Sequence, residues 1–128
     1  MKRRLVVTAV ALVALVAFVG FNLLSTGTAR AQTGDGCVHQ PTIDSLETCV
    51  EHAASQGLIN SKGVTQSLLA KLDAAEEAIE EGHTSQAIHL LRAFIHEVEA
   101  QSGKHIDPMH AQDMVMHAQM VIDALENG

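Results

Sequence analysis

The sequence predicts an all-α fold, a small antiparallel bundle of about four amphipathic helices. Apolar residues recur every three or four positions in four successive segments. No stretch alternates apolar and polar residues with the two-residue period of a strand. The connections between segments are about two to six residues long, which favours antiparallel packing of successive helices. We assign this single helical domain to residues 42–126.

The first two helices have clear starts and ends. Pro41 and Thr42 precede the first helix, and Gly57 follows it as a residue past the helix end. Its expected core stripe is Ile43, Leu46, Cys49, Val50 and Ala53. Asn60 or Ser61 can cap the second helix, which ends at Gly82. Its stripe is Val64, Leu68, Leu72, Ala75 and Ile79.

The last two helices are delimited in the same way. Thr84 is the expected cap of the third helix, which ends at Gly103. Its apolar face contains Ala87, Leu90, Leu91, Phe94, Ile95 and Val98. Asp107 followed by Pro108 predicts a sharp start for the fourth helix, because Asp accepts the free amides and Pro suits the first helical position. The expected stripe there is Ala111, Val115, Ala118, Ile122 and Leu125.

The N-terminus has the order of a secretory signal peptide. Basic residues 2–4 precede an uncharged apolar run from Leu5 to Leu24, and Ala29-Arg30-Ala31 is a small-x-small ending. We therefore expect residues 1–31 to be a signal peptide and 32–41 a polar lead. The run is also long enough for an uncleaved signal anchor. Both alternatives place the helical domain outside the cytoplasm, with no membrane contact beyond the leader.

Composition excludes several functions. Cleavage after Ala31 would remove four of the 8 basic residues and none of the 15 acidic ones, so the formal charge of −7 would become −11. A chain this acidic, with Phe94 as its only remaining aromatic residue, is unsuited to binding nucleic acid. It also lacks Tyr and any recognisable nucleophile motif. We therefore expect no catalytic residues and no enzymatic activity.

The two cysteines predict one structural disulfide. An exported chain with a single pair, Cys37 and Cys49, normally oxidises it. Closing a loop of this length would stabilise the fold by about 3 kcal/mol. The CxxC spacing of redox motifs is absent, and one Cys pair with scattered histidines is a weak zinc pattern.

From Gly57 to Leu125 the chain resembles the FIMAH domain, a small helical module of secreted bacterial proteins. The matching text includes residues 60–64, Asn-Ser-Lys-Gly-Val, and the more specific run Phe94-Ile95-x-x-Val98-x-Ala100-x-x-Gly103-Lys104. The resemblance implies an extracellular module that binds or attaches rather than catalyses. No hydrolase of the kind that usually accompanies this domain is present in the sequence, and the cysteine pair and Met-rich last helix are not expected features of it.

The fourth helix carries the candidate site residues. Met109, Met116 and Met120 form a stripe nearly opposite the expected core face, which is centred near Val115, Ala118 and Ile122. Such a stripe suits an adaptable contact surface for a partner or for self-association. The alternative is a copper-type metal site formed by His110, Asp113, Met116 and His117, because thioethers and imidazoles suit copper. No other cofactor is expected.

The sequence therefore predicts an exported, non-enzymatic helical module. Its partner would be a protein or a cell-envelope component, or a second copy of the chain, and the methionine stripe would be the contact surface. The alternative function is extracytoplasmic binding of copper or another transition metal.

Overall fold

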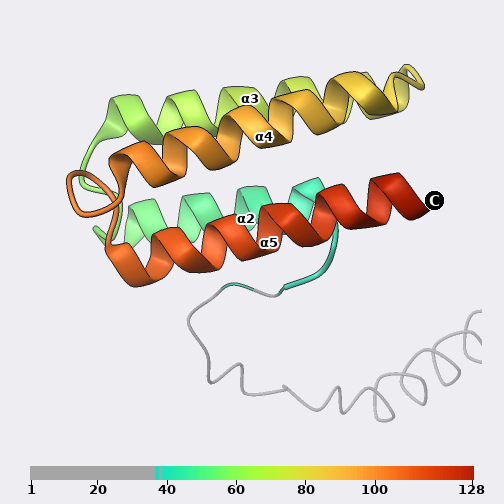
Figure 1. Cartoon of the computed structure of the whole chain (residues 1–128). Helices are drawn as coiled ribbons and strands as arrows, with labels where there is room; N and C mark the ends of the chain where they lie inside the picture. Colours follow the sequence, from blue (N-terminus) through green and yellow to red (C-terminus); the bar gives the residue numbers. More distant parts are fainter. Residues whose placement is uncertain (1–36, 38) are drawn as a thin grey trace, which may run out of the picture. The chain divides into compact units, whose positions relative to one another are not determined.

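The computed structural model describes residues 37 and 39–128, which belong to the compact unit Thr33–Gly128. It contains helices α2 (Ile43–Ser55), α3 (Lys62–Glu80), α4 (Thr84–Gln101) and α5 (Pro108–Asn127). The predicted all-α bundle is thereby confirmed (Figure 1). The predicted signal peptide lies outside the described residues. None of the described helices is long and apolar enough to cross a membrane.

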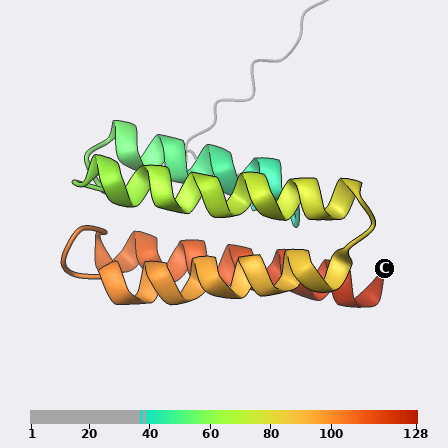
Figure 2. The same ribbon diagram turned by 90° about the horizontal axis from the view of Figure 1, so that it is seen from above.

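The four helices form an antiparallel bundle in which each helix packs against its two neighbours. α2 contacts α3 and α5, and α4 also contacts α3 and α5 (Figures 1 and 2). The α2–α3 and α4–α5 connections lie at one end of the bundle, on the left in Figure 1, and the α3–α4 connection lies at the other. This arrangement gives α5 two partners, and it buries residues on two adjoining sides of that helix.

Side-chain caps begin three of the helices, and two of them, Ser61 and Asp107, are caps that the sequence predicts. Thr42 Oγ1 accepts a hydrogen bond from the Ser45 amide at the start of α2, and Ser61 Oγ accepts one from the Val64 amide at the start of α3. Asp107 Oδ1 accepts the amides of Met109 and His110 at the start of α5. Hydrogen bonding by His110, through its amide and then its side chain, lowers the pKa of Asp107.

The predicted cap of α4 was wrong by one residue. Thr84 is the first helical residue, and His83 holds the cap position without a side-chain hydrogen bond to the helix. The reason is the short connection: Gly82 has a φ of 79°, and the His83 amide already bonds the Ala78 carbonyl. The chain therefore enters α4 directly. Gly57 and Gly103 also have positive φ, which confirms the predicted helix ends.

The core follows the predicted stripe in α2. In α4, Ala87, Leu91, Phe94 and Val98 are buried as predicted, whereas Leu90 and Ile95 are only partly buried. In α3, Ala78 is buried in place of Ile79, which is only partly buried. The buried residues of α5 are Ala111, Met114, His117, Ala118, Val121 and Ile122. Met114, His117 and Val121 were not expected in the core, whereas the predicted Val115 and Leu125 are partly buried.

The error in α5 is a rotation of the buried face. At about 100° per residue, its observed centre lies roughly 60° from the predicted one, toward Met114 and His117. The apolar pattern of α5 alone does not show that α2 lies beside it as well as α4. Contact with α2 turns the histidine-bearing flank inward, and His117 is 0% exposed.

The two loops at one end of the bundle also pair with each other. The Asn60 amide donates to the His105 carbonyl at 2.9 Å, and the Asp107 amide donates to the Leu58 carbonyl at 2.8 Å. These bonds hold Ile59 and Ile106 against the end of the core, where both are buried. The loops thus close the bundle.

A polar contact joins α3 to α4. Lys71 Nζ pairs with Glu97 Oε2 and donates to Ser67 Oγ at 3.0 Å, and Ser67 Oγ donates to Glu97 Oε2 at 2.9 Å. All three side chains are partly buried. The carboxylate is satisfied by both donors, so this network fixes the register of the two helices.

The loop residue Ile106 should behave as a core residue. We expect Ile106→Ala to lower the free energy of unfolding by about 2–5 kcal/mol, because it removes buried apolar volume at the closed end of the bundle. Urea unfolding followed by circular dichroism measures this change. Lys104→Ala, in the same loop but exposed, should change it by less than about 0.5 kcal/mol. Equal effects of the two substitutions would contradict the assignment.

Candidate functional site

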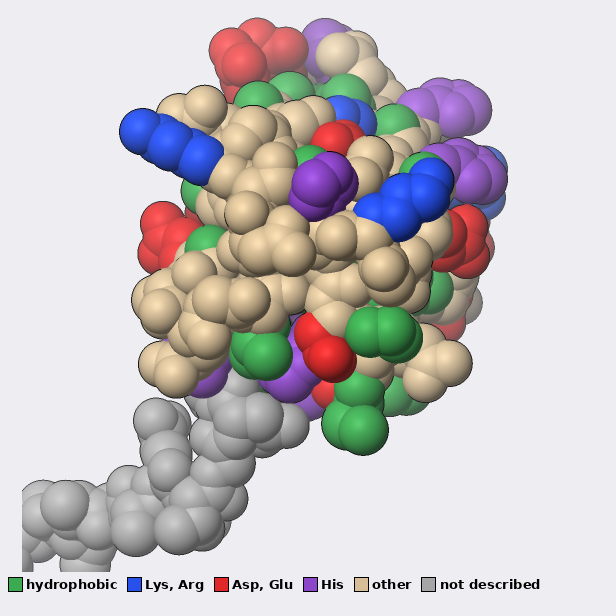
Figure 3. Space-filling model, turned by 90° about the vertical axis from the view of Figure 1, so that its left-hand side faces the viewer, with side chains coloured by type: hydrophobic (Ala, Val, Ile, Leu, Met, Phe, Trp, Pro, Cys, Tyr) green, Lys and Arg blue, Asp and Glu red, His purple; other side chains and the backbone are tan. Residues whose placement is uncertain are grey.

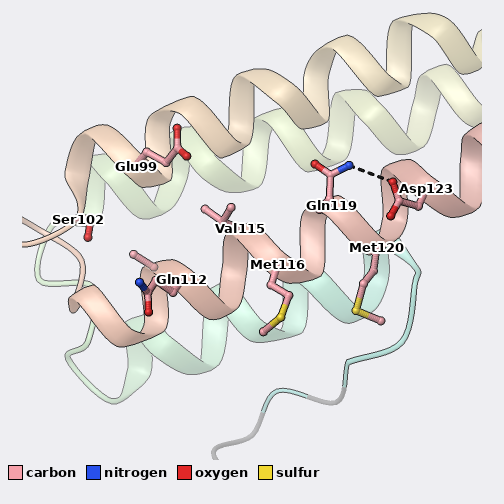
Figure 4. Close-up of a pocket in the computed structure, with 9 residues that line it drawn as sticks. Glu99, Ser102, Gln112, Val115, Met116, Gln119, Met120 and Asp123 are labelled. Atoms are coloured by element: carbon pink, nitrogen blue, oxygen red, sulfur yellow. Dashed lines mark hydrogen bonds between the residues drawn. The ribbon is translucent and has the colours of Figure 1, made fainter.

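The exposed methionines of α5 border a groove. Among the described residues, the large hydrophobic side chains that are exposed are Met109 (70%), Met116 (56%) and Met120 (37%). Met116 and Met120 line a groove of about 520 Å³ together with Val115, next to α4. Figure 4 shows Val115 on the side of α5 that faces Glu99 of α4, with Met116 and Met120 one turn apart on the adjoining surface. We call this the Met groove.

The rim of the Met groove is polar and acidic. Glu99 on α4 and Asp123 on α5 line it, and both are exposed. Gln119 Nε2 donates to Asp123 Oδ1 at 3.0 Å, which holds that carboxylate beside the groove (Figure 4). The groove therefore combines apolar lining residues, two of them flexible methionines, with the negative charge of Glu99 and Asp123.

The predicted copper-type residues do not share one surface. His117 is fully buried, whereas Met116 is exposed at the groove. His110 Nδ1 lies 3.3 Å from Asp107 Oδ1, at the start of the helix, and Asp113 is partly buried. In the described part of the chain, no three His, Cys, Asp or Glu residues are arranged to hold a metal ion.

His117 instead joins a second cluster, which we call the Cys–His cluster: Cys37, His39, Cys49 and His117. The predicted disulfide joins Cys37 to Cys49, with the Cα atoms 4.8 Å apart. His117 Nδ1 lies 3.7 Å from Cys49 Sγ, and the centroids of the His39 and His117 rings are 5.2 Å apart. The His117 Nε2 is hydrogen-bonded to the carbonyl of Gln40.

The environment keeps His117 neutral. Burial is the main cause that lowers its pKa, and the nearby His39 acts in the same direction. The hydrogen bond with the Gln40 carbonyl opposes this shift but does not reverse it. The imidazole therefore carries one proton at neutral pH, on the nitrogen that bonds to the carbonyl.

The closed end of the bundle has a smaller depression of about 260 Å³ between the two paired loops. Asn60, Lys104 and His105 line it, and His105 Nδ1 is 2.9 Å from Asn60 Oδ1. Figure 3 looks onto this end, where Lys or Arg side chains project on both sides, a His side chain lies near the centre, and hydrophobic side chains protrude at the lower edge. The structure thus brings Asn60, from the matching text at residues 60–64, close to Gly103 and Lys104, which end the Phe94–Lys104 run.

Comparison with known families identifies the domain. The model of the FIMAH domain matches residues 43–123. This chain belongs to the FIMAH domain family. No curated protein and no solved structure gave a match.

The matched span covers α2, α3 and α4 and most of α5, so it begins earlier than the resemblance found in the sequence. Cys49 and His117 lie inside the span, and Cys37 and His39 precede it. The Cys–His cluster is therefore where the polar lead is fastened to the FIMAH domain. The family match agrees with the predicted fold and adds no ligand.

Sequence reasoning missed the Cys–His cluster because its members are far apart in the chain. His117 is 68 residues from Cys49 and lies on a different helix. The seven-residue spacing of His110 and His117 correctly placed them on one flank of the helix, but nothing in that spacing shows that the flank faces α2. The available signal was the pairing of two cysteines with a large number of histidines.

Glu47 on α2 is a second group that the sequence did not single out. Its Oε1 is buried and has no hydrogen-bond partner among the described residues. Burial, followed by the charges of Asp73 and Glu76 on α3, raises the pKa of Glu47 to about 7, and the charge of Asp44 adds to this. Ionisation of Glu47 therefore destabilises the folded protein.

Ionisation of Glu47 should make the stability of the fold depend on pH. Because the pKa of Glu47 is raised above its ordinary 4.5, its stabilising contribution is complete below pH 4.5 and is lost as the pH rises through about 7. Glu47→Gln mimics the protonated carboxyl, so we expect it to raise the melting temperature by a few degrees at about pH 8 and by much less at pH 4.5.

Thermal unfolding at the two pH values tests this, with Glu51→Gln as the control on the same helix. Glu51 is exposed, so its substitution should have a small effect that does not follow the Glu47 pattern. A Glu47→Gln gain that is the same at both pH values would show that ionisation of Glu47 is not its cause.

Proposed function

We propose that this FIMAH domain is an exported, non-enzymatic module that binds an amphipathic, basic segment of a partner protein in the Met groove. The observation that carries the proposal is the position of Met116 and Met120, which are exposed beside a groove of about 520 Å³. Export is supported by the order of charged, apolar and small residues before Gln32 and by the disulfide.

The apolar lining of the groove favours a partner with apolar side chains. Methionine side chains are unbranched and adapt to different shapes, which suits recognition of a helix or peptide rather than of a rigid small molecule. Covering Met116 and Met120 would remove apolar area from water at little cost, because neither thioether must give up a strong hydrogen bond. Burial of this apolar surface would supply most of the binding free energy.

The charge of the rim favours a basic partner over a second copy of the chain. Glu99 and Asp123 border the groove, and the chain has a formal charge of −7. A second copy would bring like charge to the same surface, which opposes self-association. A segment with Lys or Arg beside its apolar residues would pair with the rim and associate faster.

The test uses a synthetic amphipathic helix of Leu and Lys as the probe for the full chain, with a Leu–Glu helix and a scrambled Leu–Lys peptide as controls. We expect the Leu–Lys helix to bind and the other two to bind far more weakly. Replacing Met116 and Met120 together with Gln should weaken binding at least about tenfold, because apolar burial is lost without a change of charge. Calorimetry or fluorescence titration measures the affinities.

Met109→Gln is the matched control, since Met109 is exposed on the same helix but does not line the groove. Equal losses for Met109→Gln and for the groove variant would contradict the proposal, as would equal binding of the scrambled peptide. Sedimentation velocity of the full chain completes the test: self-association that the groove variant abolishes would assign the groove to a second copy instead.

A further inference from the structure

The Cys–His cluster has a composition that the disulfide alone does not require. Two sulfur atoms and two imidazoles meet there, and they come from the lead, α2 and α5. Cys49 and His117 are buried in the FIMAH domain, whereas Cys37 is partly exposed and His39 is exposed. The cluster lies apart from the Met groove, and none of its four residues lines that groove.

The tautomer of His117 leaves one ring nitrogen free to ligate. A backbone carbonyl only accepts hydrogen bonds, so His117 Nε2 carries the proton donated to Gln40. His117 Nδ1 therefore holds a lone pair, and it points at Cys49 Sγ. A disulfide sulfur has no hydrogen, so no proton lies between these two atoms. A histidine that donates one N–H to a carbonyl while its other nitrogen faces a cysteine sulfur is oriented as in a metal site.

The spacing of the two buried atoms is that of ligands on one ion. Zinc binds sulfur at about 2.3 Å and imidazole nitrogen at about 2.0–2.1 Å in tetrahedral geometry, which places sulfur and nitrogen about 3.5 Å apart. The distance from Cys49 Sγ to His117 Nδ1 is 3.7 Å. Packing of α2 against α5 already holds this pair, and the lead brings the second sulfur and the second imidazole beside it.

We propose that reduction of the Cys37–Cys49 disulfide converts the Cys–His cluster into a tetrahedral site for zinc or a zinc-like divalent cation, with Cys37, His39, Cys49 and His117 as ligands. Two thiolates and two imidazoles form a set typical of zinc. While the disulfide is closed, neither sulfur is an anionic thiolate, and the described residues contain no arrangement that could hold a metal ion. The oxidation state of the cysteine pair thus decides whether the site exists.

The chemistry balances with a dithiol as the reductant. One thiolate of the dithiol attacks the Sγ of Cys37, which is the more exposed cysteine, and the Cys37–Cys49 bond breaks with Cys49 leaving as a thiolate. The second thiol of the reductant then releases Cys37, so two electrons pass to the cysteine pair and the reductant becomes a disulfide. Binding of the cation by both sulfurs displaces two thiol protons into solvent.

The experiment titrates Co²⁺ into the reduced full chain under anaerobic conditions, because cobalt reports its ligands by absorption. We expect one cobalt ion per chain, a thiolate-to-cobalt charge-transfer band and the visible bands of tetrahedral cobalt. Zinc should displace the cobalt and should slow alkylation of both cysteines. The oxidised chain should give no such bands, and circular dichroism should show that the reduced chain keeps its helices.

Variants separate the four ligands from other histidines. Cys49→Ser should weaken the charge-transfer band, because it leaves a single thiolate ligand, and His117→Gln should weaken cobalt binding at least about tenfold. His39→Ala changes an exposed residue, so it keeps the proposal testable if a buried variant fails to fold; it should also weaken binding about tenfold. His110→Gln, outside the cluster, should bind cobalt like the unmodified chain.

Three results would overturn the proposal. The first is a folded, reduced chain that gives no tetrahedral cobalt spectrum with cobalt in excess. The second is equal binding by the oxidised and the reduced chain, which would place the metal elsewhere. The third is a loss of affinity in His110→Gln that equals the loss in His39→Ala, which would favour the surface of α5 near its start.

Discussion

The packing of α5 against both α2 and α4 is the constraint on which both candidate sites depend. Its buried residues, from His117 round to Ile122, cover an arc of about 140° at about 100° per residue. One edge of that arc brings His117 to the disulfide, and the opposite side of the helix leaves Met116 and Met120 beside the groove. A single helix thus supplies a buried polar cluster and an exposed apolar surface.

Local signals in the sequence predicted the elements of the fold well. Ser61 and Asp107 act as the predicted caps, and the glycines that end the first three helices have positive φ, because each of these roles depends only on near neighbours in the chain. The cap at Thr84 was misplaced because a short connection let α4 begin one residue early. Burial of Ile59 and Ile106 could not be predicted, since it depends on two loops pairing across the bundle.

The candidate site was predicted in part. The exposure of the methionine stripe follows from its position opposite the apolar residues of α5, a property of one helix. The groove also needs Glu99 from α4, and the Cys–His cluster needs α2 and the lead. The rotation of α5 about its own axis decides which residues reach the Met groove and which reach the Cys–His cluster. That rotation depends on which helices lie beside α5. For this reason His117 was assigned to a surface that it does not share.

Two residues of the Cys–His cluster come from packed helices and two come from the lead that precedes them. Cys49 and His117 lie within the residues matched to the family and are held by helix packing, whereas Cys37 and His39 precede them. Helix packing therefore presents half of a ligand set in advance, and the lead completes it. The hydrogen bond between His117 and the Gln40 carbonyl serves both states of the cysteine pair, because it needs only the proton on Nε2. Reduction then need not release the lead: that bond orients the imidazole whether the two sulfurs are joined to each other or both bind a cation.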